Sequence, residues 1–218
     1  MNFARARYLF FRTLHGLVSR RHAFNYIYRT RGWRGESVSG AASSLQRTAA
    51  VREALPAILQ KTRSRSLLDI PCGDCHWIRH VPLKLDRYIG GDIVTPLVEQ
   101  NRHAWPGPDR EFRVLDLVTD PLPQADLVFC RDCLIHLSLR DGRAALDNIR
   151  RSGSRYLLTT TFPGAANKPI ITGQWRPIDL TRPPFNLPEP DQLISERHPD
   201  FPAKSLGLWH LADAPEPA

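Results

Sequence analysis

Two short apolar runs in this chain end on acidic residues, and their spacing is typical of a nucleoside-binding site. The first run leads through Asp69 into a turn at Gly73, and the second ends on Asp92. Asp92 follows Gly73 by 19 positions, close to the gap of about 20 residues between a glycine turn and a ribose-binding acid in a nucleotide-binding βαβ unit. The turn lets backbone N–H groups approach a ligand, and the carboxylate accepts hydrogen bonds from a ribose diol.

The composition of the turn argues against a phosphate ligand. A phosphate-binding turn is rich in glycine and opens a helix N-terminus to the anion. This turn has a single glycine and an acid, Asp74, which would repel a pyrophosphate. We therefore expect an adenosine compound without phosphates. The missing Gly-x-Gly-x-x-Gly turn also disfavours a nicotinamide enzyme.

The two runs resemble motifs I and II of class I S-adenosylmethionine-dependent methyltransferases. In the first motif the usual three glycine positions hold Pro71, Gly73 and Cys75. Segments that resemble the later motifs follow in order at 111–117, 125–132 and 155–162. The resemblance covers roughly residues 36–211 and rests on this ordered co-occurrence. It implies S-adenosyl-L-methionine (SAM) as the cofactor and methyl transfer as the reaction.

The resemblance also implies which residues bind the cofactor. Asp92 would hold the ribose, Asp69 would brace the glycine turn and reach the ligand's amino group, and Asp116 with Leu117 would flank the adenine. Each acid also has a structural interpretation, as a turn cap, a loop brace or an ordinary strand end. The full set is Asp69, Pro71, Cys72, Gly73, Asp92, Ile93, Asp116, Leu117 and Arg131.

Two residues after the fourth expected strand have the chemistry of a general base. Asp132 and His136 are four positions apart, so on a helix they would share one face and form a carboxylate–imidazole pair. Such a pair can take a proton from a hydroxyl. The alternative is a polar helix start, with catalysis by proximity alone.

The acceptor is expected to be a small molecule or a glycan that is methylated on oxygen. The signature (Asp/Asn)-Pro-Pro-(Tyr/Phe) of enzymes that methylate nucleic-acid amino groups is absent. The sequence does not identify the acceptor further.

Two segments contain candidate substrate contacts. Around residues 33–44, small polar residues beside an aromatic predict either a lid or a hinge. The second segment follows Pro163, where Arg176 would clamp the acceptor or pair with Asp179. The candidates are Trp33, Glu36, Ser39, Trp175, Arg176 and Asp179.

The four cysteines have the pairwise spacing of a zinc site, Cys72-x2-Cys75 and Cys130-x2-Cys133. The two pairs would meet if the first and fourth strands are neighbours, so a non-catalytic zinc or nucleotide-binding module stays an alternative. The resemblance assigns Cys72 to the cofactor loop and Cys130 to a buried strand end. We therefore expect no metal, reduced thiols and a cytoplasmic location. Phe129, not proline, precedes Cys130, which disfavours a cysteine nucleophile.

The order of the elements predicts an α/β fold. Strands are expected at 66–70, 87–92, 111–116, 126–131 and 155–162, and helices after Ser44 and at about 75–80, 95–104 and 141–150. Such alternation is typical of a parallel sheet with helices on both faces. Two later strands are expected at 193–197 and 204–211. The resemblance implies that they form an antiparallel hairpin, which gives a Rossmann-like methyltransferase fold with a mostly parallel seven-stranded sheet.

The charge distribution divides the chain into a basic helical N-terminal extension, 1–35, and a methyltransferase domain, 36–218. The extension contains eight arginines and no acid, and so supplies the entire net charge of +8. The remainder is neutral and does not predict a nucleic-acid-binding surface.

The extension itself has several interpretations. We expect a helical cap over the active site, with residues 1–22 outside the cofactor site, so that their removal leaves cofactor affinity nearly unchanged. An RNA methyltransferase that uses the arginines, an anionic lipid or acidic partner, and a targeting peptide stay open. No apolar run approaches the roughly 20 residues of a membrane span.

Overall fold

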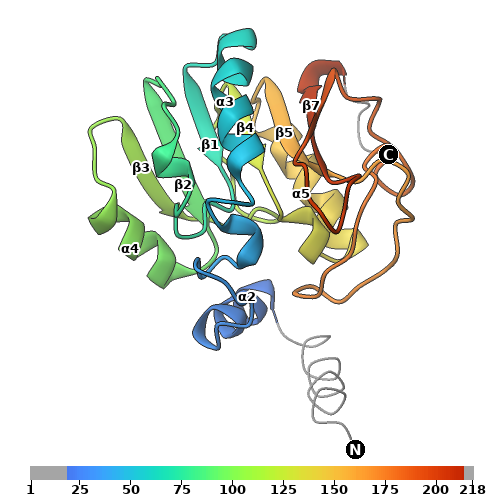
Figure 1. Cartoon of the computed structure of the whole chain (residues 1–218), viewed down its shortest axis with the longest axis horizontal. Coiled ribbons are helices and arrows are strands. Elements are labelled where there is room, and N and C mark those ends of the chain that lie inside the picture. The colour runs from blue at the N-terminus through green and yellow to red at the C-terminus, as the bar shows by residue number, and fades with distance from the viewer. Residues whose placement is uncertain (1–18, 214–218) are drawn as a thin grey trace, which may run out of the picture.

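The computed structural model describes residues 19–213 and contains a seven-stranded sheet in the order β3-β2-β1-β4-β5-β7-β6. The first five strands pair in parallel, and β7 is antiparallel to both β5 and β6. The mostly parallel sheet and the C-terminal antiparallel hairpin are thus confirmed (Figure 1). The strands are β1 (Ser66–Asp69), β2 (Arg87–Asp92), β3 (Arg110–Val114), β4 (Leu127–Cys130), β5 (Tyr156–Thr161), β6 (Gln192–Ser195) and β7 (Ser205–His210).

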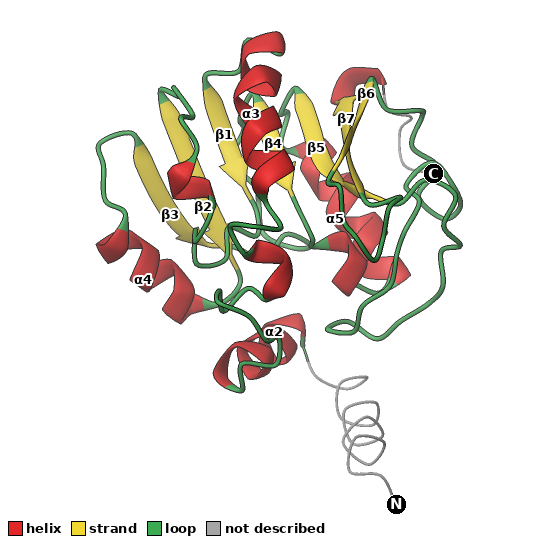
Figure 2. Ribbon diagram, viewed as in Figure 1, coloured by secondary structure: helices red, strands yellow, loops and turns green. Residues whose placement is uncertain are grey.

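Both faces of the sheet are covered, as Figure 2 shows. Successive residues of a strand point to opposite faces, so Leu67 packs in a core with Leu55 and Leu68 packs in a second core with Ile149. The cores therefore lie under α3 on one face and under α5 on the other. The helices are α2 (Arg20–Arg29), α3 (Ala49–Lys61), α4 (Thr95–Ala104) and α5 (Leu139–Arg151), with 3₁₀ turns η1 (Ala41–Ser43), η2 (Ile78–His80), η3 (Leu134–His136) and η4 (Leu211–Asp213).

Helix starts follow their capping residues. The Ser138 hydroxyl accepts from the backbone N–H of Asp141 at 3.1 Å, so α5 begins at Leu139, two residues before the predicted start. The helix predicted after Ser44 begins at Ala49. Ser44 instead accepts from the N–H of Arg47 within a turn.

The helix predicted at about 75–80 is wrong. Cys75 has φ 51°, in the left-handed region that an α-helix cannot accommodate. The Asp74 carboxylate accepts from the N–H of His76 and holds the chain in turns. Only η2 remains helical in this segment.

The sheet topology fixes where a ligand crevice forms. β1 lies between β2 and β4: the chain runs from β1 to β2 and β3 on one side, and then crosses to β4 and β5 on the other side. In open α/β sheets, ligands bind at such a point, outside the carboxyl ends of the strands. Asp69, Asp92 and Cys130 are the last residues of β1, β2 and β4. Figure 1 shows α2 lying across this edge.

In the described part of the chain, no helix is both long and apolar enough to cross a bilayer. Residues 1–18 of the N-terminal extension lie outside the described residues, and the expectations for that segment stay predictions.

Candidate functional site

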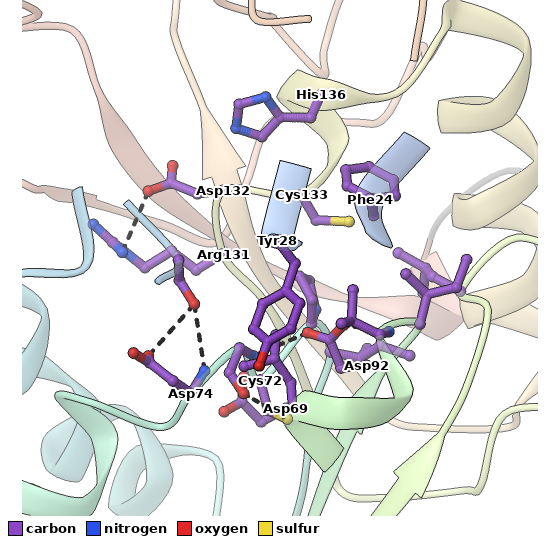
Figure 3. A pocket seen from close by; sticks show the side chains of 18 of the residues that line it. Phe24, Tyr28, Asp69, Cys72, Asp74, Asp92, Arg131, Asp132, Cys133 and His136 are labelled. Carbon is purple, nitrogen blue, oxygen red and sulfur yellow. Dashed lines mark hydrogen bonds and ion pairs between the residues drawn. The ribbon is translucent and has the colours of Figure 1, made fainter. Parts of the chain in front are cut away.

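A single pocket at the carboxyl edge of the sheet gathers most of the predicted residues. It contains about 1120 Å³ of empty space, including open solvent at its mouth. Figure 3 shows Asp69, Cys72 and Asp92 on one side of the pocket and Asp132 and His136 on the other. The predicted residues that line it are Asp69, Pro71, Cys72, Gly73, Asp92, Ile93, Asp116, Leu117, Arg131, Asp132, His136, Trp33 and Ser39.

The turn after β1 requires glycine at position 73. Its φ is 56°, and a Cβ atom there would collide with the Ser39 hydroxyl. The Gly73 N–H donates to Asp92 Oδ2 at 3.1 Å, and its carbonyl accepts from Asn101 Nδ2 at 2.7 Å. These two hydrogen bonds therefore fix the turn between the end of β2 and helix α4.

Asp92 is buried at the pocket wall. Its two oxygens accept from the N–H groups of Gly73 and Val94, the latter at 2.9 Å. Burial raises the pKa of this carboxyl to about 6, and the two N–H donors oppose that rise. Each oxygen has a further lone pair, so the carboxylate can accept two more hydrogen bonds from a diol.

Asp69 lies at the neighbouring strand end and accepts from the Tyr88 hydroxyl at 2.6 Å. Burial raises its pKa to about 7, opposed by the Tyr88 hydrogen bond, while the nearby Asp92 adds to the rise. The two carboxylates therefore give this wall of the pocket a negative electrostatic potential, which favours a cationic or hydroxyl-bearing ligand.

Helix α2 covers the pocket and is tied to it by charge. The Arg20 guanidinium contacts Asp116 at 3.0 Å and Asp141 at 3.4 Å, and Arg21 donates to the carbonyl of Ile93 at 3.0 Å. Arg20, which belongs to the segment 1–22 that was expected to lie outside the cofactor site, also lines this pocket. Sequence spacing does not reveal it, since its acidic partners are 96 and 121 residues away.

The segment after α2 docks on the glycine turn. The Ser37 hydroxyl donates to both Asp74 oxygens at 2.8 and 2.9 Å, and the N–H of Val38 donates to the same carboxylate at 3.2 Å. The Trp33 ring lies 4.8 Å from the His136 ring, centroid to centroid. This segment is thus ordered over the pocket as a lid.

A buried cluster of four charges lies behind the opposite wall. Arg131 donates to Glu196 at 2.6 Å, and Lys204 donates to Asp132 at 2.7 Å and lies 3.2 Å from Glu196. Burial alone would raise the pKa of Asp132, but the charges of Arg131 and Lys204 hold it well below its usual range. The cluster therefore joins the strand end of β4 to the β6–β7 hairpin.

The predicted Asp132–His136 pair on one helix face is not formed. Asp132 has φ 53° and precedes the turn η3, and its carboxylate contacts Lys204, Arg131 and Thr160. His136 Nδ1 instead lies 2.8 Å from the carbonyl of Gln174. Burial lowers the pKa of His136 below its ordinary value. At neutral pH the imidazole is therefore uncharged.

Four predicted substrate residues lie outside the pocket lining. Glu36 is exposed and accepts from the N–H of Leu45, and Trp175 packs on Phe162 and Phe201. Arg176 and Asp179 do not pair. Arg176 donates to the carbonyls of Leu134 and Ile135, whereas the carboxylate of Asp179 accepts from the N–H of Gly164 and from Thr181 and contacts Arg182.

The cysteine pairs do not converge. Cys72 and Cys75 pack in the core under α3, and Cys130 packs in the core on the other face of the sheet. Among residues 19–213, no three His, Cys, Asp or Glu side chains are gathered as metal ligands. The four-thiolate arrangement is therefore not present in this part of the chain.

Sequence reasoning missed several pocket residues. Phe24 and Tyr28 line it from α2, and their i, i+4 spacing on one helical face was the available signal. Trp77 and Cys133 also line it. Asn101, which holds the glycine turn, gave no signal beyond a polar residue on the packed side of α4.

Among the comparisons with known proteins, only the one with solved structures found similar proteins. No family model matches the sequence, and no curated protein matches it. Human N-acetylserotonin methyltransferase in complex with SAM superimposes with a TM-score of 0.58 at 14% identity, covering 88% of this chain and 60% of that chain. TnmH gives 0.56 at 17% identity, covering 78% and 56%, and LaPhzM gives 0.55 at 12% identity, covering 85% and 60%.

This chain thus spans 60% or less of the length of each of these structures. The superpositions are consistent with the sheet order and its antiparallel seventh strand. The chain has the fold of class I S-adenosylmethionine-dependent methyltransferases.

Proposed function

We propose that this protein is a SAM-dependent methyltransferase that acts on an oxygen of a small-molecule or glycan acceptor. The observation that carries the proposal is the Asp92 carboxylate, which ends β2 in the pocket beside the N–H of Gly73. A buried carboxylate with free lone pairs at this strand end suits a ribose diol. The nearby Asp69 and Asp74 disfavour a phosphorylated nucleotide.

The pocket residues also fit the rest of the cofactor. Apolar side chains of Ile93, Leu117 and Val118 line the part of the pocket next to Asp116 and suit an adenine ring. Asp69 suits the positive amino group of the methionine end. The Asp116 carboxylate accepts from Arg20 and from the N–H of Val118, so it would accept from the adenine amine in place of one of these contacts.

His136 is the residue that we assign as proton acceptor. A backbone carbonyl only accepts hydrogen bonds, so the 2.8 Å contact with Gln174 requires the proton on Nδ1. Nε2 then bears the lone pair. When bound, SAM supplies a sulfonium methyl that the acceptor oxygen attacks as the carbon–sulfur bond breaks. His136 Nε2 takes the hydroxyl proton, and the lid over the pocket limits access of water.

Asp132 is proposed to support the reaction electrostatically from the same wall. Because Arg131 and Lys204 keep this carboxylate ionised and hydrogen-bonded, it is a weak base. Its negative charge would stabilise the imidazolium that forms when His136 takes the proton. We place the enzyme in the cytoplasm, in line with its four unpaired cysteines.

The test is methyl transfer from SAM labelled on the methyl group to two acceptor pools, hydroxylated aromatic and sugar compounds in one and total RNA in the other. We expect label in the first pool, and a loss of about 10²–10⁴-fold in rate for His136→Gln if the imidazole is the base. Label in RNA would instead support the RNA methyltransferase. Failure of the intact protein to bind SAM would overturn the proposal as a whole.

A further inference from the structure

A loop segment is hydrogen-bonded along its length to the turn that carries His136. The N–H of Gly173 donates to the carbonyl of His136 at 2.8 Å, and the N–H of Arg176 donates to the carbonyl of Ile135 at 3.2 Å. Between them, the carbonyl of Gln174 contacts His136 Nδ1 at 2.8 Å. The 173–176 segment therefore fixes both the backbone and the ring of His136.

The side chain of Arg176 adds to this attachment. Its Nη1 atom donates to the carbonyls of Leu134 at 3.3 Å and Ile135 at 3.1 Å, the two residues that precede His136 in η3. Within the turn the carbonyl of Leu134 also accepts from the N–H of Leu137 at 3.2 Å, so the guanidinium adds a second donor to this peptide unit. One guanidinium nitrogen thus holds two consecutive peptide units.

Burial of the Arg176 side chain has a high free-energy cost. It is 4% exposed, and its Nε and Nη2 atoms have no hydrogen-bond partner among the described residues. No carboxylate contacts it there, and burial lowers its pKa to about 10, so it stays cationic at neutral pH. An unpaired buried cation destabilises a fold. Its presence here therefore indicates a role other than stability.

We propose that Arg176 is the positioning residue for His136: it clamps η3 through the carbonyls of Leu134 and Ile135 and holds a positive charge beside the imidazole. The purpose of the clamp rests on the proposed function, in which Nε2 accepts a proton. The clamp itself is a property of the protein without ligand. Arg176 then acts through His136 and does not bind the acceptor directly.

The charges around His136 are consistent with this role. Burial is the main cause that lowers the pKa of His136, and the cations Lys204 and Arg176 act in the same direction. The Gln174 carbonyl and the Asp132 carboxylate oppose them. Asp132 is itself paired with Lys204. Of these two cations, Arg176 has no carboxylate contact among the described residues. Its charge is therefore not offset by a neighbouring anion.

The experiment is ¹⁵N NMR of the imidazoles in the intact, ligand-free protein over a pH series, with the His136 signals assigned by their loss in His136→Gln. In the wild type we expect the Nδ1–H tautomer and a pKa below the ordinary histidine value. In Arg176→Met the pKa should rise and the Nδ1–H tautomer should lose population. Arg176→Lys keeps the charge and should restore the wild-type pKa.

The matched control is Arg182→Met, an exposed arginine of the same loop that contacts Asp179, and it should leave His136 unchanged. A folded Arg176→Met variant with wild-type His136 signals would overturn the proposal. If that variant does not fold, a wild-type spectrum with the Nε2–H tautomer would overturn it equally.

These readouts separate the clamp from the enzyme activity. If the protein fails to bind SAM while His136 responds to Arg176→Met, the proposed function fails and the clamp stands. If SAM binds but His136 does not respond, the clamp fails and the proposed function stands.

Discussion

The acidic side chains of the pocket fall into two electrostatic groups. Burial raises the pKa of Asp69 to about 7 and that of Asp92 to about 6, on the side where a ribose and an amino group would bind. On the opposite side, Arg131 and Lys204 lower the pKa of Asp132. The first group therefore titrates near neutral pH, and the second stays ionised.

This difference predicts a proton linkage in ligand binding. A ribose diol and a ligand ammonium group both favour the ionised forms of Asp92 and Asp69, so binding lowers their pKa values. Protons should be released on binding of S-adenosylhomocysteine (SAH) at pH 6–7, and affinity should rise with pH up to about 7 and then level off. Calorimetry in two buffers with different ionisation enthalpies measures the release.

The control for this linkage is the Asp69→Asn variant, in which proton release should shrink because one of the two groups no longer titrates. Affinity that is independent of pH between 5 and 8 would show that neither carboxylate contacts the ligand.

At the residue scale, sequence spacing correctly predicted that the residues after β1 and β2 lie together at one pocket wall, and it predicted the contacts of the opposite wall less well. Parallel strands bring their carboxyl ends to one edge, so residues after β1, β2 and β4 had to meet. The contacts of Asp132 depended on Lys204, which is 72 residues away on the hairpin. Its left-handed backbone also prevented the helix that the four-residue spacing predicted.

At the scale of elements, the lid depends on a backbone approach that only glycine permits at position 73. In Gly73→Ala the new Cβ would displace the Ser39 hydroxyl from its contacts with Asp74. It would also strain a left-handed residue by about 1–2 kcal/mol. We expect a loss of stability greater than that strain, and weaker binding of SAH, measured by thermal unfolding and calorimetry.

Gly164→Ala is the matched control, because Gly164 has φ 85° but a Cβ atom added there would have no neighbour within 4 Å. It should show the backbone strain alone, with SAH affinity unchanged. Equal effects of the two variants on stability and binding would mean that the contact between Ser39 and the turn is unimportant.

Helix α2 is expected to act as a latch through Arg20. Because Arg20 holds Asp116 and Asp141 at the pocket wall, Arg20→Ala should let the helix open more often. The rates of SAH association and dissociation should then both increase, with a smaller change in affinity. Stopped-flow fluorescence can follow this, since Trp33 and Trp77 line the pocket.

A matched control for the latch is Arg29→Ala, at the C-terminal end of the same helix, which should leave both rates near those of the wild type. A dissociation rate unchanged by Arg20→Ala would contradict the latch.

At the scale of the whole molecule, the β6–β7 hairpin is fastened to the sheet by buried charge as well as by strand pairing. Lys204→Met would leave Asp132 and Glu196 with Arg131 as the one remaining cation of the cluster. Breaking a buried ion pair in this way costs about 3–5 kcal/mol. Chemical denaturation measures the loss.

Lys61→Met serves as the control, because Lys61 also joins the hairpin, through Gln192, but at an exposed site. It should cost less than about 1 kcal/mol. A similar small cost for Lys204→Met would show that the buried cluster does not stabilise the hairpin.

The overall architecture was predictable from sequence because alternating apolar runs and helices leave few topologies. The seven strands lie at their expected positions within a few residues. The docking of α2 was predicted only as a cap, since its anchors Asp116 and Asp141 come from distant elements. The turns at 74–80 depended on Cys75 adopting a left-handed backbone, which residue type alone does not signal.

The central claim is that Asp92 binds the ribose of SAM, and calorimetric titration of SAH into wild type and Asp92→Ala tests it most directly. We predict a loss of about 1–3 kcal/mol in binding free energy, because the ribose hydroxyls would lose a buried acceptor. Asp86→Ala, which removes an exposed carboxylate paired with Arg65, should bind as the wild type does. Wild-type affinity in a folded Asp92→Ala variant would contradict the account.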